Sequence, residues 1–136
     1  FDSQDAISYW IALDDASLNR GCLHFLPGSH KSNDYSRTNI GVNVGEIFHS
    51  FPELAKIHPV AVPVKAGDCI FFNGMVVHGA GANMTPHYRR AMTCGLMPKN
   101  ATFNGKKNIL SEAYFRSLTV GEPLDNYEEL PLLYDN

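Results

Sequence analysis

Three residues have side chain types and a spacing that could do chemistry together: Trp10, His78 and Arg89. An imidazole is a good ligand for a first-row transition metal, and a guanidinium can grip a carboxylate through two parallel hydrogen bonds. Together they would suit a metal that binds an organic acid cosubstrate. Spacing alone leaves two alternatives open: His78 as a backbone-bonded histidine at the end of a strand, and Arg89 as a surface ion-pair partner.

Two strand-like segments must position these residues. Residues 6–13 alternate along the chain, with Trp10 among small residues on one face and bulky apolar residues on the other. Because both faces are largely apolar, we expect both to be covered. Residues 89–97 repeat this design, with Arg89 and Thr93 on the face of small residues. We expect the two strands to face each other around a pocket, with 78 and 89 flanking a loop between antiparallel neighbours.

The rest of the chain predicts an all-β domain with little helix. Many short strands separated by turn residues are typical of an antiparallel sandwich or a small barrel. The length of 136 residues fits one domain, residues 1–136. Further short strands are expected at 22–26, 60–64, 69–72 and 75–78, with a tight turn at 65–68. A long polar loop at 31–45 could cover the substrate side, and helical segments are expected at 51–56 and 110–118.

Composition excludes several classes of protein. The net charge of −3 provides no basic field for nucleic acid or an anionic membrane, and no apolar run is long enough for a spanning helix. Cys22, Cys69 and Cys94 are odd in number and form no CxxC pair, which argues against a disulfide scaffold or a thiolate zinc site. We therefore expect a reducing, cytoplasmic compartment.

Three stretches of the chain resemble the phytanoyl-CoA dioxygenase family of Fe(II)/2-oxoglutarate oxygenases. The specific feature is a Pro-Gly-Ser-His element, residues 27–30, combined with a later block of His78, Asn83 and Arg89. The stretches that carry the resemblance are 7–16, 21–31 and 67–91.

The resemblance implies a fold, two cofactors and a set of site residues. The fold would be a double-stranded β-helix (jelly roll), here without its N-terminal strands, and the activity would be hydroxylation of a small organic substrate with Fe(II) and 2-oxoglutarate. His78 would correspond to the distal metal histidine, Arg89 to the arginine that holds the C5 carboxylate of 2-oxoglutarate, and Trp10 to a pocket wall. Ala80 stands where the family usually has a serine that can hydrogen-bond the cosubstrate.

One departure from the family concerns the metal. The His-x-Asp motif that supplies the other two iron ligands should lie upstream of the strand at 6–13, and no such motif occurs there. A facial triad needs three protein donors, so the chain as given should bind iron poorly, and it looks truncated before that motif.

Other residues have weaker claims to the site, and other functions stay open. Ala80, Asn83, Thr93 and His24 are expected in the pocket wall, although Asn83 would equally serve to stabilise its loop and His24 to fill the core. One alternative is a cupin-like metal-binding module, although the chain lacks the His-x-His that cupins need. The other is a catalytically silent, truncated jelly roll that self-associates through exposed strand edges.

Overall fold

A computed structural model describes residues 5–31, 45–107 and 110–135 of the chain. Residues Ala6–Leu96 form one compact unit, and Met97–Asn136 with the first residues of the chain form a second. The assignment of 1–136 to a single domain stays a prediction.

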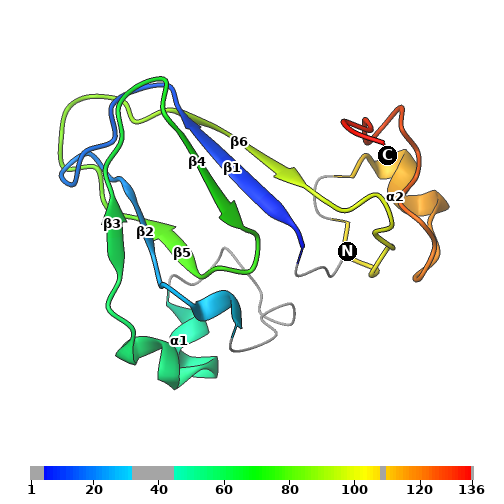
Figure 1. Ribbon diagram of the computed structural model, residues 1–136, viewed down its shortest axis with the longest axis horizontal. Helices are drawn as coiled ribbons and strands as arrows, with labels where there is room; N and C mark the ends of the chain where they lie inside the picture. Colours follow the sequence, from blue (N-terminus) through cyan, green and yellow to red (C-terminus); the bar gives the residue numbers. More distant parts are fainter. Residues whose placement is uncertain (1–4, 32–44, 108–109, 136) are drawn as a thin grey trace. The chain divides into compact units, whose positions relative to one another are not determined.

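The first unit contains two three-stranded antiparallel sheets, which confirms the predicted all-β class (Figure 1). In the first sheet, β1 (Ile7–Ala12) lies between β4 (Cys69–Asn73) and β6 (Ala91–Leu96). In the second, β2 (Leu23–Phe25) lies between β3 (Val60–Val62) and β5 (His78–Ala80). Pro63 follows β3 directly, at the sheet edge where the missing donor of a proline is tolerated.

The core of this unit lies on the face of β1 that carries Trp10. Trp10 and Ala12 are only 5% and 1% exposed. They pack with Cys22 and Leu23 in a cluster that Phe72 of β4 and residues of the other strands complete. Since side chains alternate across a strand, the register places Thr93 of β6 opposite Trp10, on the same face. This core cluster therefore joins the two sheets.

The opposite face of the first sheet is open among the described residues, so the expectation that both faces of β1 would be covered is wrong there. Ile7, Phe71 and Met92 are 44%, 67% and 49% exposed. The register places all three on the side away from Trp10, in three adjacent strands. This face is called the outer apolar face below.

Two expectations about strand pairing are also wrong. Strands β1 and β6 do not face each other across a pocket, because they are hydrogen-bonded neighbours in one sheet. His78 and Arg89 do not flank a loop between antiparallel neighbours, because β5 and β6 belong to different sheets. The segment between them crosses from one sheet to the other.

His78 begins a strand rather than ending one, contrary to expectation. The apolar residues 75–77 do not join a sheet, since side chains take up their backbone donors. The Asn73 carboxamide oxygen accepts from the Met75 amide at 2.8 Å, and the Ser29 hydroxyl accepts from the Val77 amide at 2.9 Å. Pairing with the short strand β2 starts only at His78.

Short helices complete the first unit. A 3-10 turn, η1 (Ser29–Lys31), follows the Pro-Gly stop of β2, and a second, η3 (Pro52–Lys56), confirms the helical turn expected at 51–56. Helix α1 (Glu46–Ser50) was not anticipated. Most of the predicted polar loop, 32–44, lies outside the described residues.

The second unit has its own small core, formed by Ala101, Phe103, Tyr114 and Leu124. Helix α2 (Glu112–Ser117) lies within the segment predicted to be helical, and the Ser111 hydroxyl caps its start by accepting from the Tyr114 amide at 3.2 Å. Over the described ranges, no helix has the length and apolar character to cross a membrane.

Candidate functional site

Arg89 and Trp10 lie together, as the sequence predicted. The guanidinium carbon of Arg89 is 5.8 Å from the centroid of the Trp10 ring, a cation–π distance. Trp10 is buried on the core face of β1, whereas Arg89 is half-buried and precedes the first residue of β6, Ala91. Thr93, on the same face of the sheet, is exposed. The indole covers one side of the half-buried Arg89 guanidinium, and a carboxylate can bind the guanidinium on its solvent side.

Arg90, the next residue, has different partners. Its guanidinium donates to both carboxylate oxygens of Asp14, from Nε at 2.9 Å and from Nη2 at 3.0 Å, and its backbone amide donates at 2.9 Å. These hydrogen bonds hold the pKa of Asp14 well below its ordinary value. Arg89 and Arg90 therefore serve separate partners, as alternation along the chain predicts.

His78 contacts the other end of the same core. Its ring lies 4.6 Å from the Phe72 ring and 5.7 Å from the Phe25 ring, between centroids, and both phenylalanines pack on the cluster that contains Trp10. Nδ1 is 2.9 Å from the Val76 carbonyl oxygen. In the tautomer that donates this hydrogen bond, Nε2 is free to bind a metal. The core cluster thus contacts His78 through Phe25 and Phe72, and Arg89 through Trp10.

The remaining predicted site residues are distributed around this core. Ala80 follows His78 at strand alternation and is exposed on the same face of β5. Asn83 lies in the loop after β5, where its amide donates to the His87 carbonyl at 2.7 Å and its oxygen accepts from the Thr85 hydroxyl at 2.8 Å. His24 alternates with the core residues of β2, and its Nδ1 lies 3.2 Å from the Cys22 carbonyl oxygen.

The donors present do not fit an iron site. Fe(II) in this class of chemistry needs three protein donors, and His78 supplies one. In the part of the chain that the structure describes, no three His, Cys, Asp or Glu side chains are grouped so that they could hold a metal ion.

Two contacts near Arg89 were not foreseen from the sequence. The first is the contact of Asp14 with Arg90. In the second, Arg20 donates from Nη2 to the carbonyl oxygen of Tyr88 at 2.7 Å. An acidic pair at 14–15 and a basic pair at 89–90 stand in the same sequence. Charge complementarity between the two pairs was the available signal.

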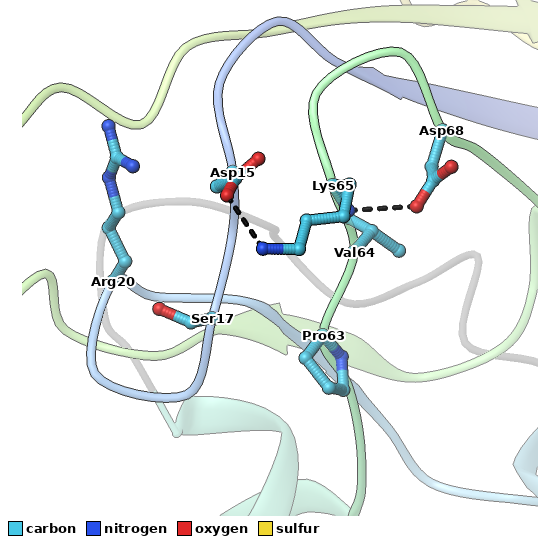
Figure 2. Close-up of a pocket in the computed structure, with 7 residues that line it drawn as sticks. All are labelled: Asp15, Ser17, Arg20, Pro63, Val64, Lys65 and Asp68. Carbon is cyan, nitrogen blue, oxygen red and sulfur yellow. Dashed lines mark hydrogen bonds and ion pairs between the residues drawn. The ribbon is translucent and has the colours of Figure 1, made fainter.

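A separate pocket of about 440 Å³ lies beside the segment that carries Asp14. Its charged groups largely neutralise one another: the Lys65 ammonium donates to Asp15 at 2.9 Å, and the Lys65 amide donates to Asp68 at 2.8 Å (Figure 2). The Asp68 contact confirms the predicted turn at 65–68. The pocket is lined by Asp15, Ser17, Arg20, Pro63, Val64, Lys65 and Asp68.

Comparisons with known proteins find relatives over much of the chain. The family model described as "Phytanoyl-CoA dioxygenase (PhyH)" matches residues 1–91. The human protein "Phytanoyl-CoA dioxygenase, peroxisomal" is 37% identical over 93 residues, which are 62% of this chain and 26% of the human protein. The chain thus spans about a quarter of that relative's length.

Solved structures are similar over more of the chain. The alpha ketoglutarate dependent carbocyclase SnoK from nogalamycin biosynthesis superposes with a TM-score of 0.72 and 29% identity, over 92% of this chain and 47% of SnoK. The epimerase SnoN in complex with Fe3+, alpha ketoglutarate and nogalamycin RO superposes with a TM-score of 0.58 and 33% identity, over 88% of this chain and 44% of SnoN.

Proposed function

Because the chain belongs to the phytanoyl-CoA dioxygenase family, we propose that it forms the cosubstrate-binding part of an Fe(II)- and 2-oxoglutarate-dependent oxygenase domain that hydroxylates a small organic substrate. The observation that carries the proposal is the Arg89 guanidinium over the buried Trp10 ring. Support for the cofactors comes from SnoN, whose complex contains Fe3+ and alpha ketoglutarate.

Arg89 holds the C5 carboxylate of 2-oxoglutarate in this proposal. A guanidinium forms two parallel hydrogen bonds to a carboxylate, and Trp10 covers one side of it, which limits the access of water and strengthens the ionic contact. A lysine would supply a point charge without this planar geometry. Arg89 therefore orients the cosubstrate as well as attracting it.

The proposed binding of 2-oxoglutarate by Arg89 does not depend on iron. His78 could contribute one ligand through Nε2, and the described residues supply no complete donor set around it. Binding of 2-oxoglutarate by Arg89 and Trp10 is accordingly proposed as a property that can be measured without the metal.

The test is a calorimetric titration of the 136-residue chain with 2-oxoglutarate in metal-free buffer. Arg89→Ala should weaken binding by about 10- to 100-fold, because a hydrogen-bonded contact to a charged group contributes roughly 1.5–3 kcal/mol. Arg116→Ala is the matched control, since Arg116 pairs with Glu112 in the second unit. The proposal fails if the unaltered chain does not bind 2-oxoglutarate or if Arg89→Ala binds it equally well.

A second candidate function is a jelly roll that binds the cosubstrate and is catalytically silent. It is favoured by the lack of a metal-binding group among the described residues. Formation of succinate from 2-oxoglutarate, dependent on added Fe(II), would support the oxygenase. Tight 2-oxoglutarate binding without succinate formation would support the silent module.

A further inference from the structure

Arg89 is held indirectly, through both of its neighbours in the chain. It precedes β6, so its own backbone is outside the hydrogen-bonded ladder of the sheet. The residue before it, Tyr88, has its carbonyl bound by Arg20, and the residue after it, Arg90, has its amide and guanidinium bound by Asp14. Both of these charged side chains come from the connection between β1 and β2.

The Asp14 contact fixes the C-terminal side of Arg89. Asp14 follows the end of β1 by two positions, and its side chain is only 16% exposed. The Leu13 amide adds a hydrogen bond to the Arg90 carbonyl at 3.0 Å. Because Trp10 lies in the same strand that leads into Asp14, this clamp ties the Arg89 segment to the strand that carries the indole.

The Arg20 contact fixes the N-terminal side. Arg20 is half-buried, and its segment is joined to the loop after β5: it forms an isolated bridge with Asn83, and the Met84 amide donates to the Asn19 carbonyl at 2.8 Å. Figure 2 shows the Arg20 side chain apart from the Asp15–Lys65 ion pair of the same pocket. Arg20 donates its hydrogen bond to the Tyr88 carbonyl, while its charge acts on Asp14 and Asp15 through space.

We propose that Asp14 and Arg20 are positioning residues that hold the backbone of 88–90, so that the Arg89 guanidinium stays over Trp10 and ready for a carboxylate. The inference rests on the proposed role of Arg89 in binding 2-oxoglutarate. Its physical basis is pre-organisation, since an arginine without fixed backbone neighbours must lose conformational freedom each time it binds. Neither residue needs to contact the cosubstrate.

Affinity for 2-oxoglutarate provides the first test. Arg20→Gln and Asp14→Asn should each raise the Kd of the chain about 10-fold, within the range seen when a supporting partner of a binding residue is removed. Arg20→Lys should restore most of the affinity, because an ammonium can still donate to the Tyr88 carbonyl. Asp15→Asn is the matched control and should leave the Kd within about twofold, as Asp15 bonds to Lys65 and Ala66.

A double-mutant cycle separates positioning from a general loss of structure. Once Arg89 is replaced by alanine, adding Arg20→Gln or Asp14→Asn should change the Kd no further, because residues that act through one another are not additive. The proposal would be overturned if Arg20→Gln and Asp14→Asn weakened binding equally with Arg89 present and with Arg89 replaced by alanine. It would also be overturned if they caused no loss of affinity while Arg89 is present. Far-ultraviolet circular dichroism of each variant monitors the fold.

The fluorescence of Trp10, the single tryptophan of the chain, gives a readout that needs no ligand. Removing the guanidinium with Arg89→Ala should alter its emission, and Arg20→Gln and Asp14→Asn should reproduce that change while Asp15→Asn does not. If the unaltered chain binds no 2-oxoglutarate, the proposed function fails, yet this emission still tests the positioning. Emission unaffected by Arg20→Gln and Asp14→Asn would overturn the positioning role of these two residues.

Discussion

At the scale of single residues, one step along the chain separates two arginines with different surroundings. Arg89 lies over an indole, whereas Arg90 is bound to a carboxylate and is exposed. Trp10 and Arg89 were expected in one pocket because of the family resemblance and the faces that alternation assigns to them. The contact of Asp14 with Arg90 had a signal in the opposite charges of the two pairs, whereas the contact of Arg20 had none, because it reaches a backbone carbonyl 68 positions away.

Replacing Ala80 by serine should tighten 2-oxoglutarate binding. Ala80 is exposed on the same face of β5 as His78, at the position where a serine hydroxyl is expected to reach the cosubstrate. One added hydrogen bond contributes about 1 kcal/mol, so the calorimetric Kd should fall about fivefold. Ala82→Ser, in the exposed loop beyond the strand, is the control. An equal gain from both substitutions, or none from Ala80→Ser, would contradict the assignment of this face.

Asp14 should make stability depend on pH in the acidic range. Its pKa is lowered, first by the side-chain hydrogen bonds from Arg90 and then by the Arg90 amide. Its stabilising contribution is therefore complete above the ordinary aspartate pKa of about 4 and is lost as the pH falls below it. Urea unfolding at pH 7 and pH 3 should show a smaller difference in Asp14→Asn than in the unaltered chain. Asp125→Asn, exposed in the second unit, should retain the full difference.

At the scale of elements, local sequence predicted the strands better than their partners. The alternation in 6–13 identified β1, but it predicted two covered faces, and among the described residues only the face of Trp10 is covered. Strand partners depend on contacts between distant segments, so the pairing of β1 with β6 was missed. The start of β5 was misplaced because Asn73 and Ser29 occupy backbone donors that a hydrophobic pattern does not reveal.

Gly21 should be essential to the close approach of the segment before β2 and the loop after β5. It has a φ of +76°, and a Cβ at this position would lie 2.6 Å from the Gly81 carbonyl oxygen. Gly28 has a similar φ of +79° but open space around it, which makes it a matched control. Gly28→Ala should lose about 1 kcal/mol of unfolding free energy for backbone strain, and Gly21→Ala about 2 kcal/mol more for the clash. Equal losses in urea titrations would show that the close approach is unimportant.

At the scale of the whole molecule, the chain leaves much apolar surface open. The outer apolar face has exposed side chains on β1, β4 and β6, and each sheet ends in strands that pair on one side only among the described residues. Composition could not reveal this, because an apolar strand face has the same sequence whether or not something covers it. The chain spans 47% of SnoK, and its relatives contain further segments beyond the matched part.

The isolated chain should self-associate as its concentration rises. Large exposed apolar patches and open strand edges both favour association. Phe71→Lys, at the most exposed side chain of the outer apolar face, should shift sedimentation toward the monomer, whereas Leu133→Lys in the second unit should have little effect. A chain that sediments as a monomer at all concentrations would contradict this expectation.

The most direct measurement of the central claim is a crystal structure of this chain with 2-oxoglutarate bound. We predict that the C5 carboxylate lies within hydrogen-bonding distance of the Arg89 guanidinium, beside the Trp10 ring. An ordered 2-oxoglutarate molecule elsewhere in the chain, with Arg89 turned to solvent, would contradict the account.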